Sequence, residues 1–240
     1  MKRLIIIPTY NEAENAPILI RRLLKHIPDS EILVIDDGSP DGTAGVVERL
    51  QKEFRNIHIL KRNKKSGLGS AYRTGFAWGL ERGYSEFVEM DADMSHRVRD
   101  LAKMISTKEQ HPAASLVIGS RWIKGGATTN WSKSREMLSR AANLYVRFML
   151  GMGVRDATAG FRIYSADILR KIDLTSIKSE GYSFQIEMTR EVRRLGGSII
   201  EVPIIFRERE QGVSKMSKKI VREAMFLVTV WGLKRVLKVK

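Results

Sequence analysis

Short apolar segments recur along the first half of the chain and alternate with segments of helical periodicity. Apolar, largely β-branched runs predict buried strands at residues 4–7, 32–35, 57–60, 87–90 and 115–118. Between the first two runs, Ile18, Leu19 and Leu23 lie at helical spacing, and Asn11 with Glu14 predicts the start of that helix. Regular alternation of strands and helices predicts an α/β fold with a mostly parallel central sheet flanked by helices.

Two later segments combine helical apolar spacing with interleaved basic residues, which is the pattern of a helix at a membrane surface. In Lys133–Met149, packing against the domain explains the pattern equally well. At the C-terminus, a short apolar run near Trp231 lies between two basic clusters, and this favours membrane contact, with self-association as the alternative. We therefore predict a main domain over residues 1–210 and a C-terminal loop and basic amphipathic helix over 211–240, both within one domain unit.

Turn-forming and acidic residues follow three of the predicted strands. These loops span residues 8–12, 36–41 and 91–96, and the carboxyl ends of parallel strands meet at one edge of a sheet. Asp91 and Asp93 follow an apolar strand one residue apart, and paired carboxylates suit Mg²⁺ or Mn²⁺ shared with substrate phosphates. An isolated D-x-D more often only ends a strand, so the pattern by itself leaves that alternative open.

A basic, glycine-containing loop, Lys61–Gly69, is expected at the same edge of the sheet. Its Lys64, Lys65, Gly67 and Gly69 could approach phosphate groups, but the loop lacks the phosphate-binding G-x-x-x-x-G-K-[ST] pattern. An exposed loop without a ligand explains the same residues.

Composition narrows the function further. The 240 residues carry a formal net charge of +15 and no cysteine, which excludes disulfides, thiolate metal sites and a cysteine nucleophile. A positive net charge of this size predicts polyanionic partners, such as nucleic acid, anionic lipid or phosphorylated substrates. The sequence shows no signal peptide at its start and no apolar stretch of the roughly 18–20 residues that a spanning helix needs, so we expect a cytoplasmic protein.

Several longer motifs occur in a specific order along almost the whole chain. The main ones are IPTYNEAEN at 7–15, VIDDGSPDGT at 34–43, SGLGSAYRTGF at 66–76, MDADMSH at 90–96, GSRW at 119–122, DATAGFR at 156–162 and GYSFQIEM at 181–188. In this combination the chain resembles the dolichyl- or polyprenyl-phosphate mannose synthases, members of a large inverting glycosyltransferase family with the GT-A fold.

The resemblance implies a role for each matching position. It implies a nucleotide-sugar site made of Pro8, Tyr10, Glu12, Ile35, Asp37, Asp91, Ala92, Asp93, Arg121, Arg209 and Lys215, with Asp36 holding the loop. It implies a lipid-phosphate site made of Arg121, Arg135 and Ser139. Mg²⁺ or Mn²⁺ would bind Asp91, Asp93 and Ser95, the last standing where some members carry a Gln ligand. Catalysis would depend on Asp91, Asp93, Arg121 and Arg209.

The implied reaction transfers mannose from GDP-mannose to a polyprenyl or dolichyl monophosphate with inversion. A phosphate acceptor is already ionised near neutral pH, so no general base is required. Glu187 or His96 as a base is an alternative, although a Glu187 that holds a loop is the simpler expectation.

The implied setting is the cytoplasmic face of an anionic membrane, to which the protein binds peripherally. A membrane-protein partner or self-association through the C-terminal helix is compatible with the pattern, whereas nucleic acid is not expected, because the basic residues lie beside amphipathic segments. Two alternatives remain at this stage. One is transfer of glucose or another sugar from a different nucleotide sugar, and the other is a non-enzymatic, basic protein that binds anionic lipid.

Overall fold

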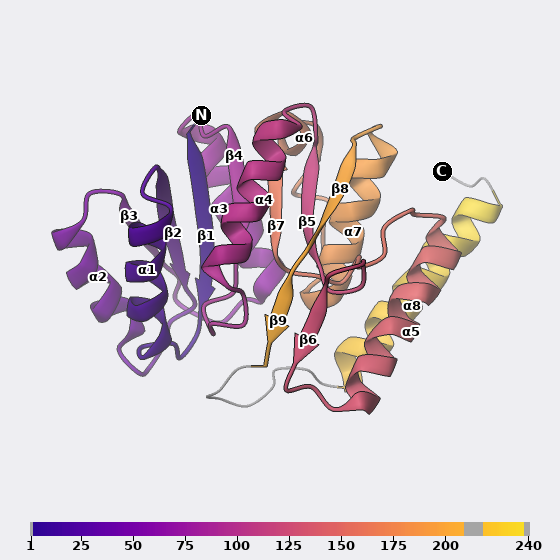
Figure 1. The fold of residues 1–240 in the computed structure, drawn as a ribbon, viewed down its shortest axis with the longest axis horizontal. Helices are drawn as coiled ribbons and strands as arrows, with labels where there is room; N and C mark the ends of the chain where they lie inside the picture. Colours follow the sequence, from indigo (N-terminus) through magenta and orange to yellow (C-terminus); the bar gives the residue numbers. More distant parts are fainter. Residues whose placement is uncertain (1, 209–217, 238–240) are drawn as a thin grey trace.

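A seven-stranded sheet, ordered β3-β2-β1-β4-β7-β5-β8, runs through the molecule (Figure 1). The computed structural model describes residues 2–208 and 218–237. The strands are β1 (Arg3–Thr9), β2 (Ser30–Asp36), β3 (Ile57–Lys61), β4 (Glu86–Glu89), β5 (Leu116–Ser120), β7 (Arg162–Ser165) and β8 (Ile199–Pro203). β7 is antiparallel to both of its neighbours, β4 and β5, and the other pairs are parallel. The predicted mostly parallel sheet is therefore confirmed.

Helices cover both faces of this sheet because its strands are apolar on both sides. Along β1, Ile5 and Ile7 join the core that contains Leu19 of α1, whereas Leu4 and Ile6 join the core on the other face. Helices α1 (Asn15–His26), α2 (Thr43–Glu53) and α4 (Val98–Gln110) pack on the first face. Helices α3 (Leu68–Glu81), α6 (Ala166–Lys171) and α7 (Gly181–Arg194) pack on the second.

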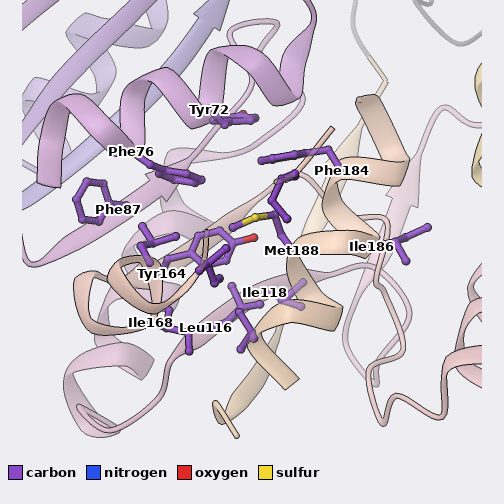
Figure 2. Packing of buried hydrophobic residues seen from close by; sticks show 14 of the residues in the cluster. Tyr72, Phe76, Phe87, Leu116, Ile118, Tyr164, Ile168, Phe184, Ile186 and Met188 are labelled. Carbon is purple, nitrogen blue, oxygen red and sulfur yellow. The ribbon is translucent and has the colours of Figure 1, made fainter. Parts of the chain in front are cut away.

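Aromatic side chains fill the second core. Figure 2 shows Tyr72 and Phe76 of α3 close to Phe184 of α7 and Tyr164 of β7. The rings of Tyr72 and Phe184 are nearly parallel with centroids 6.1 Å apart, and Phe76 meets Phe87 edge-on at 5.9 Å. This packing fixes α3 and α7 against each other, and their N-terminal residues then lie at the same edge of the sheet.

Two long helices lie side by side at one end of the molecule (Figure 1): α5 (Lys133–Leu150) and α8 (Lys218–Val236). The short parallel pair β6 (Ala127–Thr129) and β9 (Ile205–Arg207) lies between them and the main sheet. Both helices expose large apolar side chains: Met137, Leu138, Leu144 and Phe148 in α5, and Met225, Phe226, Leu233 and Val236 in α8. No helix among the described residues combines the length and apolarity needed to cross a membrane. The first predicted basic amphipathic segment is thus helical, and so is the described part of the second, over Lys218–Val236.

The predicted start of the first helix is wrong. Asn11 has a φ of 59°, in the left-handed region, and α1 begins at Asn15 without a capping side chain. The loop before α1 is instead held by the loop after β2 and by the first residue of α2. Asp41 accepts a hydrogen bond from the backbone N–H of Ala13 (3.0 Å), and Thr43 accepts one from that of Glu12 (3.0 Å). Contacts distant in sequence therefore replace the local cap.

We predict that Gly79→Ala destabilises the protein by about 1–3 kcal/mol, even though alanine favours helices more than glycine does. A Cβ at residue 79 would meet the side chain of Phe87 and lie 2.7 Å from Leu4 Cδ2, so α3 would have to move off the sheet. Gly45→Ala in α2 is the matched control. Its Cβ would meet only Arg49 Nη1, at 4.0 Å, so it should stabilise by about 0.5–1 kcal/mol. Denaturant unfolding followed by circular dichroism measures both, and equal effects would contradict the close contact between α3 and the sheet.

Candidate active site

A cleft of about 430 Å³ opens at the carboxyl ends of the parallel strands. Its wall is formed by segments far apart in sequence. They include Pro8 near the end of β1, Glu12 after that strand, residues 91–93 and His96 after β4, Arg121 after β5, 158–160 before β7, and Tyr182 and Gln185 of α7. The structure thus brings together two of the three predicted loops.

The third loop, after β2, supports the first. Asp36 is buried and accepts hydrogen bonds from the Thr9 hydroxyl (3.0 Å) and from the backbone N–H of Ser39 (2.9 Å). Asp36 therefore holds the loops together, as the sequence predicts.

Asp91 and Asp93 both lie in the wall of the cleft. Asp93 Oδ1 accepts a hydrogen bond from the backbone N–H of Ser95 (3.1 Å), which fixes the turn that carries both carboxylates. Carboxylate oxygens are the donors that Mg²⁺ and Mn²⁺ prefer, so these residues fit the predicted metal. No group of three or more His, Cys, Asp or Glu among the described residues could hold a metal. Further ligands would therefore come from other oxygens, such as those of substrate phosphates.

Ser95 is less exposed to the cleft than the two carboxylates. Its side chain is 1% exposed, is not in the cleft wall, and its hydroxyl has no hydrogen-bond partner within the described part of the chain. Its role as a third ligand stays a prediction.

His96 supports the backbone of the Asp91 turn. Its Nδ1 accepts a hydrogen bond from the N–H of Asp91 (3.2 Å), and its ring stacks on Phe161 with centroids 4.5 Å apart. Burial lowers the pKa of His96 to about 4, although Asp93 acts in the opposite direction, so the ring is neutral near pH 7. Its acceptor nitrogen is already used by the backbone, which argues against a role as general base.

Glu187, the other candidate base, is not in the cleft wall. It accepts a hydrogen bond from the hydroxyl of Ser179, in the loop before α7. This contact supports the simpler expectation that Glu187 holds a loop.

A buried ion pair fixes Arg121 in the cleft wall. Nε and Nη2 donate to the two carboxylate oxygens of Asp156 at 2.8 and 2.7 Å, and Nη2 also donates to the Thr158 hydroxyl (3.0 Å). Burial alone would lower the pKa of Arg121, but the Asp156 carboxylate more than compensates and raises it. The guanidinium group is therefore a permanent positive charge held in one orientation.

A smaller, mainly apolar groove of about 70 Å³ adjoins the cleft between α5, α7 and α8. The predicted lipid-phosphate residues Arg121, Arg135 and Ser139 all line it. Its apolar walls are formed by Leu138, Ala142, Val146, Ile186, Ala224, Met225 and Val228. Arg121, Arg135 and Trp131 line both the cleft and this groove, so the groove opens from the cleft. We call it the apolar groove.

The structure corrects the prediction for Ile35. Its side chain is fully buried in the core, where it packs beneath Gly75 of α3 and cannot contact a ligand in the cleft. Asp37 is also outside the cleft wall, since its carboxylate accepts hydrogen bonds from Arg62 Nε (2.6 Å) and the N–H of Ser66 (3.1 Å). Tyr10, likewise outside the wall, packs against the ammonium group of Lys65. Arg209 and Lys215 lie outside the described residues.

Glu180 was not foreseen from the sequence. Its carboxylate accepts hydrogen bonds from the backbone N–H groups of Gly69 (2.7 Å) and Ser70 (3.0 Å), at the N-terminus of α3. Gly69 is one of the residues of the basic loop that could approach phosphates, and a protein carboxylate already uses its backbone N–H. Lys65 and Gly67 of that loop do line the cleft.

Two further residues of the site, Asp156 and Gln185, were also not assigned a role. Gln185 is 1% exposed, lies in the cleft wall and is near the buried Glu89, whose pKa burial raises to about 8. Both residues lie within motifs already noted, DATAGFR and GYSFQIEM, which was the signal that could have identified them.

The chain is similar in sequence to known proteins of one family. The model of the family described as Glycosyl transferase family 2 matches residues 4–173. An undecaprenyl-phosphate mannosyltransferase of Micrococcus luteus is 52% identical over 97% of this chain and 95% of its own length. A polyprenol monophosphomannose synthase of Mycolicibacterium smegmatis is 49% identical over 97% of this chain and 88% of its own.

Solved structures share the fold at low sequence identity. Glucosyl-3-phosphoglycerate synthase of Mycobacterium tuberculosis superposes with a TM-score of 0.72 at 17% identity, over 96% of this chain and 79% of that one. A mannosyltransferase of Pyrobaculum calidifontis, in complex with GDP-mannose and Mn²⁺, gives 0.58 at 17% identity, over 100% and 65%. The predicted GT-A fold is confirmed.

We predict that Asp156→Asn destabilises the protein by about 3–5 kcal/mol, because it leaves the charge of Arg121 buried without a counter-charge. Adding Arg121→Met to Asp156→Asn should recover part of this loss, since no uncompensated charge then remains. Denaturant unfolding of the wild type, both single variants and the double variant measures the coupling. Strictly additive losses would show that the pair does not depend on the two charges.

Proposed function

Because this chain belongs to glycosyl transferase family 2 and is a glycosyltransferase, we propose that it transfers mannose from GDP-mannose to a polyprenyl monophosphate, with inversion. The observation that carries the proposal is the position of Arg121 and Arg135. They stand where a cleft with paired carboxylates meets an apolar groove, so one phosphate with a lipid tail could bind beside a nucleotide sugar.

The names of two relatives at about half identity support mannose as the sugar and a polyprenyl phosphate as the acceptor. The fold neighbour in complex with GDP-mannose and Mn²⁺ is compatible with the donor and the metal. The nucleoside would bind near Pro8 and Glu12, at the end of the cleft formed by β1.

The nucleoside diphosphate of the donor gains negative charge as it leaves the sugar, so positive charge is needed beside it. Mg²⁺ or Mn²⁺, held by Asp91, Asp93 and substrate oxygens, would supply that charge when bound. The backbone N–H of Asp91 donates a hydrogen bond to His96, and the backbone N–H of Ser95 donates one to Asp93. These two bonds support the turn that carries both carboxylates. Arg209 and Lys215 remain predicted to close over the diphosphate.

The acceptor needs positively charged side chains that bind its phosphate, and it does not need a general base. A phosphate monoester is ionised near neutral pH, so an oxygen of it can attack the anomeric carbon while the bond from that carbon to the leaving diphosphate breaks. Attack from the face opposite the leaving group inverts the configuration. Arg121, oriented by Asp156, and Arg135, whose guanidinium lies 4.1 Å from the Trp131 ring centroid, would hold the attacking phosphate in line.

The isoprenoid tail would run through the apolar groove between α5 and α8. The exposed apolar side chains of both helices continue from that groove, so they would contact the bilayer that carries the lipid. The protein would then bind peripherally to the cytoplasmic face of an anionic membrane. Self-association or a membrane-protein partner through the C-terminal helix stays a prediction.

A transfer assay with detergent-solubilised polyprenyl phosphate and Mg²⁺ or Mn²⁺ tests the donor. GDP-mannose, GDP-glucose, UDP-glucose and UDP-N-acetylglucosamine are compared, and we expect mannosyl lipid from GDP-mannose alone.

Asp93→Ala should lower turnover by about 100-fold or more, because charge stabilisation of a leaving group contributes on that scale. Asp167→Ala, at an exposed carboxylate in α6, is the matched control and should keep full activity. Preference for another donor would replace mannose in the proposal. Lipid binding without transfer from any donor would instead favour the non-enzymatic alternative.

A second assay tests the path of the lipid tail. Ala142 lines the apolar groove, whereas its neighbour Ala141 is exposed, so Ala142→Phe would fill the groove and Ala141→Phe would not. We expect Ala142→Phe to raise the KM for polyprenyl phosphate about tenfold, the scale of losing burial of a few methylene groups, with the KM for GDP-mannose unchanged. An equal effect of both variants, or an effect on the KM for the donor alone, would place the tail elsewhere.

A further inference from the structure

A third pocket, of about 140 Å³, lies beside α5 and shares no lining residue with the cleft or the apolar groove. It is lined by Arg140, Asn143, Leu144 and Arg147 of α5, by Arg155 in the segment after that helix, and by Trp122 after β5. We call it the arginine pocket. Three guanidinium groups from two segments thus converge on one small space, and no carboxylate is in its wall.

Two of these arginines have no counter-charge in the part of the chain that the structure describes. Arg140 pairs with Glu136 one turn away, at 2.8 Å, whereas no described carboxylate pairs with Arg147 or Arg155. Glu201 lies close to Arg155, but its two oxygens accept hydrogen bonds from the backbone N–H groups of Arg155 (2.8 Å) and Asp156 (3.0 Å). The pocket therefore keeps an excess of positive charge.

The aromatic residue in the wall holds one of these guanidinium groups in place. Arg140 lies over the indole ring of Trp122, 4.3 Å from the ring centroid. A guanidinium group can only donate hydrogen bonds. A set of donors of this kind matches the oxygens of a phosphate group, which arginine contacts through paired N–H bonds.

The surroundings of the arginine pocket indicate which phosphate it binds. Leu144 in its wall is 66% exposed, and Phe148 one turn further along α5 is 80% exposed. An apolar side chain that inserts into a bilayer places basic groups on the same helix at the level of the lipid headgroups. A soluble phosphate would need no such neighbours.

We propose that the arginine pocket binds the phosphodiester headgroup of an anionic phospholipid, at a site separate from the one for the acceptor lipid. The proposal rests on the membrane contact of α5 proposed above, but not on the sugar, the nucleotide or the transfer reaction. The bound headgroup fixes the depth and rotation of α5 at the membrane. The effect reaches the acceptor site through Asn143, which lines the pocket and donates a hydrogen bond to the hydroxyl of Thr158 (3.0 Å), itself a partner of Arg121.

Vesicle flotation with the full-length protein tests the proposal. The vesicles contain phosphatidylcholine, with or without phosphatidylglycerol, and carry neither polyprenyl phosphate nor nucleotide. The variants are R147Q/R155Q, which removes two charges, and R147K/R155K, which keeps the charge but loses the paired N–H donors. The control R22Q/R49Q removes two exposed arginines on α1 and α2, at the other end of the sheet (Figure 1).

We expect the partition coefficient of R147Q/R155Q onto phosphatidylglycerol vesicles to fall about 10- to 30-fold, from the contribution of two basic residues at an anionic surface. The partition coefficient of R147K/R155K onto the same vesicles should fall at least about threefold, because lysine cannot reproduce the paired hydrogen bonds of arginine. R22Q/R49Q should bind as the wild type does. All four proteins should bind pure phosphatidylcholine equally.

Two results would overturn the proposal. If R147Q/R155Q partitions like R22Q/R49Q, the pocket does not bind the headgroup. If R147K/R155K keeps full binding while R147Q/R155Q loses it, the protein is attracted to the membrane by its positive charge alone, and the pocket makes no specific contacts with the headgroup. Transfer activity in detergent is measured in parallel and should be unchanged in R147Q/R155Q, so a failure of the proposed reaction is recognised separately. Unchanged circular dichroism melting of each variant shows that folding is not the cause of any loss.

Discussion

The geometry of the site depends on the buried contact between Arg121 and Asp156. Desolvating two charges costs free energy, and such a pair is worthwhile only when hydrogen bonds satisfy both groups. Here the Asp156 carboxylate accepts bonds from the backbone N–H, Nε and Nη2 of Arg121, and its own backbone N–H donates to Glu201. The result is a cation that cannot rotate away, held where the cleft and the apolar groove meet. Two negatively charged substrates would otherwise repel each other across this junction.

The side chains of helix α5 lie in three different environments. Val146 and Leu150 are buried in the core, Ser139 and Ala142 line the apolar groove, and Met137, Leu144 and Phe148 are exposed. Any shift of the helix would therefore change the groove and the exposed face together. The hydrogen bond between Tyr145 and Thr229 (2.7 Å) links α5 to α8, so the two helices form one surface beside the active cleft.

Most of the fold could be predicted from local sequence, because buried parallel strands are continuous apolar runs and recur at regular intervals. Asp91 and Asp93 were found for the same reason, since they follow such a strand, whereas Asp36 and Arg121 were assigned their roles only by the resemblance. The failures arose where distant segments decide the outcome. Asp156 contacts Arg121 across 35 positions and Glu180 contacts Gly69 across 111, and no periodicity encodes such pairs. Ile35 was misassigned because a motif shows adjacency to a site but not the face of the strand on which a side chain lies.

The reversed direction of β7 has a consequence for how the cleft is built. In a sheet whose strands all run the same way, only segments that leave a strand reach the ligand-binding edge. β7 runs antiparallel to β4 and β5, so the segment that precedes β7 lies at the ligand-binding edge. This segment places Asp156 next to Arg121, the residue that directly follows β5. With β7 in the parallel orientation, the four-residue strand would separate the two residues by roughly 13 Å, beyond the reach of any ion pair. Chain direction, which no single substitution can alter, is thus as necessary to this active site as the charged residues themselves.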